Sequence, residues 1–375
     1  MNLFKKIFLF AICLFGLPLA SALAYDFSSE RASVYTMWKE NYVENYYGYP
    51  AYGLVFDPDS DGDLSNDEAV SEGVGYGLLI ATMQNDQATF DKIFQAAETW
   101  MWNGKTYDWQ IATDGTKLGT NGATDADEDI AMALIIADAK QKKGEWTATK
   151  TYGIKAQILI NNLYDNNTTS EGYLKPGDAF GGADELNLSY FSPAWYRVFD
   201  KYEKKHHNWK KIIAVQYNLI KQISKNNNSL IPDWCTANGA AVSGRSYDMS
   251  YDSIRIPWRL ALDAQLNKEK KAGNYLKIFM HFIENNGATT DAKMYSLDGA
   301  EIEYHNELVV AMYAAGAIGA KSKLINTNSY IAEFKNFYDA DQQAFGTWDE
   351  AYLSYYNQSL ALLAAGFIDQ SFKIR

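Results

Sequence analysis

The sequence contains few of the residues that metal and nucleophilic sites require. Among its 375 residues are only two cysteines and four histidines. No His-Glu-x-x-His pattern occurs, which argues against a zinc hydrolase, and no Gly-x-Ser-x-Gly elbow occurs either. The run Gly73-Val74-Gly75-Tyr76-Gly77 has the wrong spacing for a dinucleotide fingerprint, and no strand is predicted before it. We interpret its glycines as positions at which a helix packs closely against a neighbour.

Positive charge is also scarce. The chain has 34 Lys and Arg residues against 46 Asp and Glu residues, a net charge of -12, and the acids are spread along it. This balance argues against nucleic acid or an anionic membrane as the partner. Because 47% of the residues are hydrophobic and only 21% are charged, the composition excludes a disordered chain.

Long apolar runs are confined to the first 24 residues. Two lysines precede the apolar run 7–19, which is too short to span a bilayer, and Ala22-Leu23-Ala24 has the small-x-small pattern of a cleavage site. We predict a secretory signal peptide over 1–24; the alternative is an uncleaved membrane anchor. No later run reaches the roughly 18 apolar residues of a membrane helix. The mature chain is therefore expected to be soluble, and secreted or periplasmic.

The predicted cleavage removes Cys13 and leaves Cys235 as the single cysteine. An exported protein without an internal disulfide must depend on a large hydrophobic core. Cys235 lies between Trp234 and Thr236, with no histidine nearby in the sequence. We interpret it as a buried packing residue rather than a nucleophile.

Apolar residues recur at helical spacing in twelve stretches, whereas strand alternation is scarce. The predicted helices are 28–42, 72–84, 89–102, 125–142, 149–164, 190–203, 207–225, 252–266, 270–285, 305–318, 328–340 and 352–366. The segment from Thr124 to Asp127 resembles a capping box for the fourth helix. Since no Pro- or Ser-rich linker interrupts 25–375, we predict one all-α domain. Twelve helices suggest a closed array of helical hairpins; periodicity alone does not exclude a solenoid, but no fixed sequence period supports one.

Five connections between these helices are long and rich in Gly, Asn, Asp and aromatic residues. They are 43–71, 103–124, 165–189, 226–251 and 286–304. Loops of this length in a compact protein are usually functional.

Carboxylates gather beside aromatic residues at the starts of three predicted helices. The clusters are Ser71-Glu72-Gly73-Val74-Gly75-Tyr76, the segment 123–131 around Asp125, and the segment 247–258 around Asp252. In each cluster the acids could simply cap a helix and complement its dipole. Cleavage of a glycosidic bond, however, needs one carboxylic acid to protonate the leaving oxygen and one carboxylate to activate water or attack carbon. Three such clusters, each preceded by a long loop, favour a glycosidase site.

Aromatic residues are abundant, with 10 Trp and 27 Tyr. Several lie in the long loops beside the acids, namely Trp102, Trp109, Tyr190, Trp234 and Tyr251. A single aromatic residue is more often packing than a platform for a sugar ring. Their concentration beside the carboxylates is nevertheless what a glycan-binding site requires.

These motifs resemble those of glycoside hydrolase family 8. Ser71-Glu72-Gly73-x-Gly75-Tyr76-Gly77 is similar to its acid-bearing motif, and the segment 122–131 is similar to its best-known signature. Further similar segments are Leu174-Lys175-Pro176-Gly177-Asp178, Tyr190-Phe191-Ser192-Pro193-Ala194-Trp195-Tyr196, Pro232-Asp233-Trp234-Cys235 and Tyr251-Asp252-x-x-Arg255. The matches run in family order from about 70 to 360.

The resemblance implies an (α/α)6 barrel and an inverting mechanism. It implies that Glu72 is the general acid and Asp252 the general base, while Asp125 holds the distorted sugar. No cofactor is expected for catalysis, and a monomer is expected. The general acid needs a raised pKa, but a helix dipole lowers the pKa of a carboxyl near its amino end. We therefore expect that burial beside aromatic residues such as Tyr76 outweighs the dipole at Glu72.

The substrate implied by the resemblance is a β-1,4-glucan, with xylan as the alternative within the same mechanism. The substrate-binding residues expected from it are Trp109, Phe180, Tyr190, Tyr251, Arg255 and Tyr356, with Tyr352 and Tyr355 as alternatives to Tyr356. Phe180 stands where similar glucanases carry Trp, which places one sugar platform in doubt. A non-catalytic glycan-binding protein is the alternative from another class, although a pure binder needs no acid and base pair.

A second site is predicted from spacing alone. The loop 57–68 fits an EF-hand calcium loop at every ligand position, although Pro58 is unusual at its position and no helix is predicted to enter the loop. The predicted ligands are Asp57, Asp59, Asp61, Asp63, Ser65 and Glu68. Calcium here would neutralise clustered acids and anchor the start of the helix that carries Glu72. The alternative is a solvated acidic turn.

Overall fold

The structure is a computed structural model, which describes residues 25–59, 61–148, 150–287, 289–302, 305–346 and 354–372. The predicted signal peptide 1–24 and the candidate cleft residue Tyr352 lie outside these residues. The α-helices of the described residues are α1 (Ser28–Lys39), α2 (Ser71–Met83), α3 (Gln87–Trp100), α4 (Thr124–Lys142), α5 (Tyr152–Asn167), α6 (Pro193–Tyr202), α7 (Trp209–Asn226), α8 (Ile256–Leu266), α9 (Lys270–Asn286), α10 (Glu307–Ala320), α11 (Thr327–Asn336) and α12 (Tyr355–Ile368). Each of the twelve predicted helices is found.

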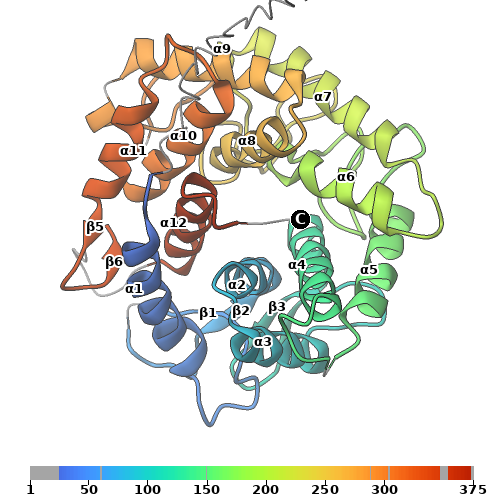
Figure 1. Ribbon diagram of the computed structural model, residues 1–375. Coiled ribbons are helices and arrows are strands. Elements are labelled where there is room, and N and C mark those ends of the chain that lie inside the picture. Colours follow the sequence, from blue (N-terminus) through green and yellow to red (C-terminus); the bar gives the residue numbers. More distant parts are fainter. Residues whose placement is uncertain are drawn as a thin grey trace, which may run out of the picture.

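The helices form two concentric rings, with the even-numbered helices inside and the odd-numbered helices outside (Figure 1). Neighbouring inner helices contact one another around the ring, and α12 closes it by contacting α2. The architecture is therefore the (α/α)6 barrel that the resemblance implies, and the solenoid alternative is wrong. None of the helices in the described residues is long and apolar enough to cross a lipid bilayer.

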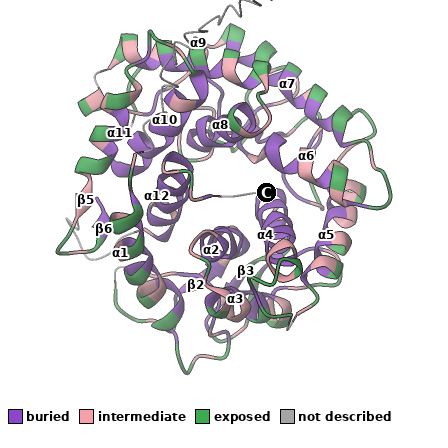
Figure 2. Ribbon diagram, viewed as in Figure 1, coloured by how far each residue is buried: buried purple, intermediate pink, exposed green. Residues whose placement is uncertain are grey.

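The inner helices are buried on nearly every side, while the outer helices expose their polar faces (Figure 2). In α4 all residues from Thr124 to Asp138 are buried, whereas α7 buries a single stripe that includes Ile212, Ile213 and Ile220. A helix enclosed by other helices must be apolar or small all round, and a surface helix only on one face. This difference in sequence pattern is what sorts the helices into the two rings.

Glycines in α2 allow the close packing predicted from the sequence. A Cβ at Gly75 would lie 3.0 Å from Asp129 Cβ and 3.1 Å from Ala126 O on the neighbouring α4. At Gly77 it would lie 2.8 Å from the side chain of Val55. These contacts confirm that the glycines bring the backbone of α2 against its neighbours.

Short strands are the feature that the sequence pattern missed. β1 (Phe56–Asp57), β2 (Glu68–Val70), β3 (Asp108–Ala112) and β4 (Lys117–Gly122) form an antiparallel sheet, and β5 (Tyr338–Asp339) pairs with β6 (Ala344–Phe345). The prediction that no strand precedes Gly73 is therefore wrong, because β2 leads directly into α2. The predicted helix 328–340 also ends earlier, at Asn336, where the chain enters β5.

Two helix starts differ from their predictions. Thr124 is the first residue of α4 rather than its cap, and its Oγ1 donates to Lys175 O at 2.6 Å. The predicted capping box is therefore wrong. The helix predicted from residue 252 begins at Ile256 and follows the 3-10 turn η3 (Ser253–Arg255). Residues 253–255 therefore form a 3-10 turn instead of the first turn of the α-helix.

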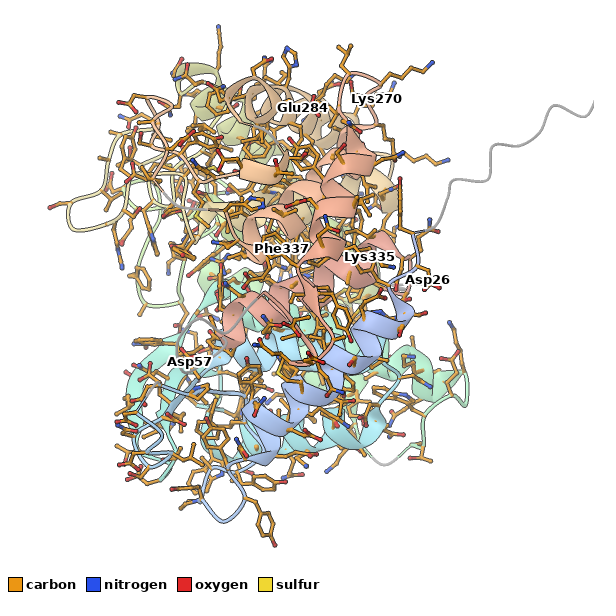
Figure 3. The ribbon with its side chains drawn as sticks, turned by 90° about the vertical axis from the view of Figure 1, so that its left-hand side faces the viewer. Asp26, Asp57, Lys270, Glu284, Lys335 and Phe337 are labelled. Atoms are coloured by element: carbon orange, nitrogen blue, oxygen red, sulfur yellow. The ribbon has the colours of Figure 1, made fainter. Side chains whose placement is uncertain are left out.

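The long connections lie at one end of the barrel. Each inner helix from α2 to α10 leads into its outer partner through a short turn, so the long connections before the inner helices gather at the opposite end. Asp57, in one of these connections, and Asp26, which precedes the outer helix α1, lie at opposite ends of the molecule (Figure 3). The amino-terminal ends of the inner helices thus share one end with the loops that were expected to be functional.

A buried ion pair joins two inner helices across the barrel. Arg259 on α8 donates from Nη1 and Nη2 to the two oxygens of Asp129 on α4, at 2.6 and 2.7 Å. Trp195 on α6 donates from Nε1 to Asp129 Oδ1 at 2.6 Å. Both charged side chains are 1% exposed. Removing one partner of such a pair leaves an uncompensated buried charge.

We predict that Arg259→Leu lowers the free energy of unfolding by about 3–5 kcal/mol, because Asp129 would remain buried without its cation. Urea unfolding followed by circular dichroism measures the loss. The control is Lys205→Leu, since the exposed pair of Lys205 with Asp165 is worth less than about 1 kcal/mol. An Arg259→Leu variant as stable as this control would contradict the prediction.

Candidate active site

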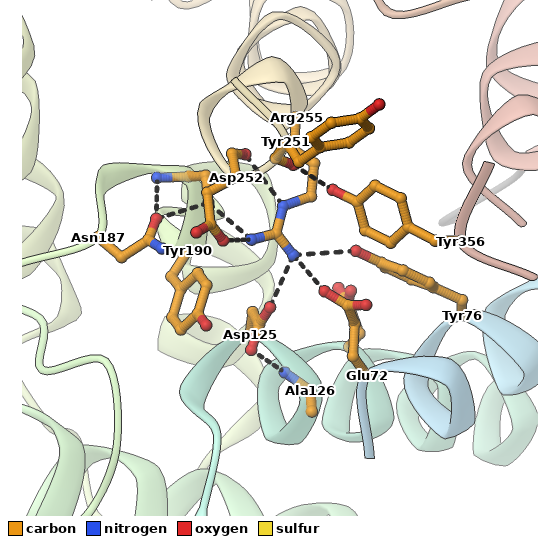
Figure 4. Close-up of polar contacts among 12 residues, drawn as sticks. Glu72, Tyr76, Asp125, Ala126, Asn187, Tyr190, Tyr251, Asp252, Arg255 and Tyr356 are labelled. Carbon is orange, nitrogen blue, oxygen red and sulfur yellow. Dashed lines mark hydrogen bonds and ion pairs between the residues drawn. The ribbon is translucent and has the colours of Figure 1, made fainter. Parts of the chain in front are cut away.

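Three carboxylates from different parts of the chain meet at one guanidinium group. Arg255 Nη1 donates to Glu72 Oε2 at 2.5 Å and to Asp125 Oδ2 at 2.8 Å, and Nη2 donates to Asp252 Oδ1 at 2.6 Å (Figure 4). Glu72 and Asp125 are each the second residue of an inner helix, and Asp252 precedes η3. The structure therefore brings together the three acids that were selected from the sequence as catalytic candidates.

Glu72 is the acid whose ionisation is most clearly perturbed. Burial raises its pKa from the ordinary value of 4.5 to about 7, against the opposing effect of Arg255 and with a further contribution from Asp125. Tyr355 on α12 donates its hydroxyl to Glu72 Oε1 at 2.9 Å. Desolvation thus outweighs the opposing charge of Arg255, and the raised pKa is what a general acid needs.

Asp125 lies deeper than the other two acids. Its side chain is almost completely buried, and its Oδ1 accepts a hydrogen bond from Ala126 N at 2.9 Å. Burial raises its pKa, while Arg255 and Arg259 oppose the rise. With both oxygens engaged by the protein, Asp125 is held rigidly beside the other carboxylates.

Arg255 has a larger role than the sequence predicted. It was expected to line the substrate site, but it is 1% exposed and forms the centre of the carboxylate cluster. Its Nη1 also donates to Tyr76 OH at 3.1 Å, and its Nη2 donates to Ser189 Oγ at 2.9 Å. Arg255 therefore sets the relative positions of the acids rather than offering a free surface to a ligand.

Two further residues of the cluster, Asn187 and Ser189, were not selected from the sequence. Ser189 donates its hydroxyl to Asn187 Oδ1 at 2.6 Å, so Asn187 orients the hydroxyl that Arg255 contacts. Tyr76, which was expected beside Glu72, follows it by four residues on the same helix, a spacing that places two side chains on one face. Nothing in the sequence, by contrast, links residues 187–189 to Arg255.

The predicted aromatic residues fall into two groups, of which one lies against the cluster. The rings of Tyr190 and Tyr356 lie 5.2 and 6.0 Å from the guanidinium of Arg255. The side chains of Trp109, Phe180 and Tyr251 are 43%, 40% and 45% exposed. The first group lies against the charged centre, while the rings of the second group are partly exposed to solvent.

Two of the exposed rings rest on glycines. A Cβ at Gly119 would lie 2.2 Å from Trp109 Nε1, and a Cβ at Gly177 would lie 2.5 Å from Phe180 Cε1. A side chain at either glycine would displace the ring. One face of each ring is thus supported by backbone, which is how a flat platform for a sugar ring is held in place.

The loop 57–68 has a geometry different from that of an EF-hand. It is flanked by the antiparallel strands β1 and β2. The backbone N–H groups of Asp61, Asp63 and Ser65 donate to the carboxylates two residues earlier, and Glu68 accepts from Gln110 Nε2 at 2.5 Å. Over the part of the chain that the structure describes, no group of three or more His, Cys, Asp or Glu side chains could hold a metal ion. The carboxylates of Asp59, Asp61 and Asp63 thus accept backbone hydrogen bonds within the loop.

The interpretation of Cys235 as a packing residue is confirmed. Its side chain is fully buried and forms no disulfide, and burial raises the pKa of the thiol to about 12. The thiolate that a nucleophile requires is therefore strongly disfavoured.

A sequence model described as glycosyl hydrolases family 8 matches residues 18–370. The chain belongs to this family. The resemblance inferred from the acid-bearing motifs is thereby confirmed.

Curated proteins similar to this family 8 chain include two endoglucanases. Endoglucanase A of Acetivibrio thermocellus is 35% identical over 317 residues, which cover 82% of this chain and 63% of that protein. Endoglucanase 2 of Ruminiclostridium josui is 35% identical over 271 residues, which cover 71% of this chain and 58% of that protein. The chain thus spans about three fifths of the length of these relatives.

A solved structure supports the fold of the family 8 chain. The structure of Rex8A from Paenibacillus barcinonensis complexed with xylose matches with a TM-score of 0.72 and 20% identity, over 93% of this chain and 94% of that one. At this identity the likeness establishes the (α/α)6 barrel, and the chemistry must be argued from the site.

We predict that Glu72→Gln stabilises the protein at alkaline pH. A carboxyl whose pKa is raised on folding binds its proton more tightly in the native state, so ionising it costs stability as pH rises from 4.5 to about 7. Gln carries no such cost, and the gain in unfolding free energy above pH 7 is on the order of 3 kcal/mol.

Urea unfolding at pH 4.5 and pH 8 measures this effect, with the exposed Glu171→Gln as the control. The advantage of Glu72→Gln is expected to be nearly absent at pH 4.5 and fully developed at pH 8. An equal difference at both pH values would contradict the prediction.

Proposed function

We propose that the protein is an inverting endo-β-1,4-glucanase, with Glu72 as the general acid and Asp252 as the general base. The observation that carries this proposal is the cluster in which one guanidinium holds Glu72, Asp125 and Asp252 together, while burial raises the pKa of Glu72 to about 7. A glycan-binding protein would have no need for a carboxyl that retains its proton at neutral pH beside two others.

In this mechanism Glu72 gives its proton to the oxygen of the scissile glycosidic bond as that bond breaks. Asp252 accepts a proton from a water molecule, whose oxygen bonds to the anomeric carbon from the opposite face of the sugar ring. The water molecule is consumed, and the β-linkage gives an α-anomer as product. For Asp125, which Ala126 N and Arg255 hold in place, we propose the role that the family resemblance implies, which is to hold the distorted sugar at the cleavage point.

The substrate proposal rests on the exposed aromatic rings and on the relatives. Trp109, Phe180 and Tyr251 each expose part of an aromatic ring, which is what a platform for a sugar ring needs. The relatives at 35% identity carry the name endoglucanase, whereas Rex8A is named as a xylose-releasing exo-oligoxylanase at 24% identity. We therefore place β-1,4-glucan first and xylan second. We also propose a monomer that is exported by the segment 1–24 and acts in the periplasm or outside the cell, as a single domain over 25–375.

We predict that the mature protein releases new reducing ends from carboxymethylcellulose and lichenan, and that NMR detects the α-anomer first. Glu72→Gln and Asp252→Asn should each lower the rate by roughly 10²–10⁴-fold, the usual contribution of a general acid or base. The exposed Glu171→Gln is the matched control. Xylan and chitosan complete the substrate panel.

Each outcome of this experiment separates two hypotheses. Activity on xylan alone would retain the acid and base and change the substrate. A β-anomer as the first product would refute inversion. Inactivity on every polysaccharide, with binding retained, would favour the glycan-binding alternative.

The calcium ion at 57–68 stays a prediction with one supporting observation. Asp57 Oδ1 is buried and makes no hydrogen bond within the described residues, and burial beside Glu68 and Asp67 raises the pKa of Asp57 to about 7. A cation there would compensate this carboxylate. If calcium is bound, a chelator lowers the melting temperature and added Ca²⁺ restores it. An unchanged melting temperature, with no calcium detected in the purified protein, would show that the prediction is wrong.

A further inference from the structure

The loop that carries Asp252 is held by a single buried carboxylate, Asp233. Its Oδ1 accepts hydrogen bonds from Ser250 N at 3.0 Å, Ser253 N at 2.8 Å and Ser253 Oγ at 2.8 Å. Its Oδ2 accepts from Ser246 Oγ at 2.8 Å and from Ser250 Oγ. The side chain is 3% exposed. Asp233 therefore fixes the backbone on both sides of Asp252.

The next residue, Trp234, contacts the carboxylate of Asp252 itself. Its Nε1 donates to Asp252 Oδ2 at 2.9 Å, while Arg255 Nη2 donates to Asp252 Oδ1 at 2.6 Å. Each oxygen of the carboxylate thus accepts one hydrogen bond from a rigid, planar group. Together the two donors fix the rotation of the carboxylate, and each oxygen keeps a second lone pair for another donor.

The indole of Trp234 is itself held on its other sides. The guanidinium of Arg245 lies 4.2 Å from its ring centroid, and Arg245 Nε donates to Glu185 Oε1 at 2.8 Å. The main chain beside it is fixed by Cys235, which exchanges two hydrogen bonds with Leu186 at 2.8 and 3.0 Å. Trp234 therefore cannot turn without breaking contacts with two neighbouring segments.

We propose that Asp233 and Trp234 are positioning residues for the general base: Asp233 places the backbone of Asp252, and Trp234 orients its carboxylate towards the attacking water. This inference rests on the proposed role of Asp252. In an inverting reaction the base must hold water in line with the breaking bond, and an error of about 1 Å can cost roughly 100-fold in rate. Asp233 controls the backbone position of Asp252, and Trp234 controls the rotation of its carboxylate.

The first test is Trp234→Phe, which keeps an aromatic ring and removes the N–H donor. The expected result is a fall in kcat of roughly 10- to 100-fold with KM changed less than about twofold, because the water-activating step is affected rather than binding.

The matched control is Trp209→Phe on α7. Trp209 is also buried, but its Nε1 has no hydrogen-bond partner within the described residues. The Trp209→Phe variant should leave kcat unchanged, although it loses about as much buried aromatic surface as Trp234→Phe. If Trp234→Phe behaves like this control, or changes only KM, the proposal is wrong.

The variant Asp233→Asn tests whether Asp233 fixes the backbone position of Asp252. It retains the shape of the side chain but replaces one acceptor oxygen with a donor, which faces serine donors. A fall in kcat with KM retained, in a variant whose melting temperature shows it to be folded at the assay temperature, supports the proposal. A folded Asp233→Asn variant with unchanged kcat would refute the role of Asp233.

A measurement independent of activity separates this inference from the proposed function. In protein labelled with ¹⁵N-tryptophan, the indole signal of Trp234 is identified by its loss in Trp234→Phe. We expect that signal to shift in Asp252→Asn, because the variant changes the acceptor of the indole N–H. A signal unaffected by this substitution would refute the hydrogen bond and the inference, even in an active enzyme. A signal that responds in a protein inactive on all glycans would support the orientation of Asp252 and reject the glucanase assignment alone.

Discussion

The arrangement of the site depends on one buried cation, the guanidinium of Arg255. Three carboxylates contact it, so the cluster would carry a net charge of −2 if all three were ionised. Such an excess is costly in a desolvated site, and one or more protons are retained instead. Burial is the main cause of the raised pKa of Glu72, and the neighbouring carboxylates Asp125 and Asp252 add to the rise that Arg255 opposes. The property that a general acid needs therefore follows mainly from desolvation, with the crowding of carboxylates around one cation as a further contribution.

The barrel makes this crowding possible. Because α2 and α4 are neighbours in the inner ring, α8 lies across the ring from α2, and all three begin at the same end, residues at or just before their starts converge on the ring's interior although up to 183 positions separate them in the sequence. The buried pair of Asp129 and Arg259 joins α4 to α8 one turn below Asp125 and Arg255. Each residue of this pair follows its counterpart in the carboxylate cluster by four positions. The two layers share the same helices, so the stability of the lower ion pair and the geometry of the upper cluster are linked.

The helices and the three carboxylates of the site could be predicted from the sequence. Twelve helices were predicted because an enclosed or amphipathic helix repeats its apolar pattern over several turns, whereas strands of two to six residues such as β1 and β4 are too short to show alternation. Glu72, Asp125 and Asp252 were identified by motif and by their places at helix starts. The central role of Arg255 was not, because its partners lie on separate helices and no local spacing encodes that contact. The same holds for Ser189, and for the buried Asp233, whose five hydrogen bonds reach residues 13 to 20 positions away.

The choice of arginine at position 255 also connects the fold to the course of the reaction. Its Nε donates to Asp252 O at 3.1 Å, Nη1 faces Glu72, Tyr76 and Asp125, and Nη2 faces Asp252 and Ser189. A lysine has three donors on one atom and could not address acceptors spread along a planar fork. Because Glu72 and Asp252 bind different nitrogens of one rigid group, neither carboxylate can shift without changing its contact with that group. In the inverting mechanism proposed above, the relative position of acid and base decides whether a water molecule fits between the base and the sugar. The planar fork of Arg255 thus links the packing of the inner helices to the geometry on which that proposal depends.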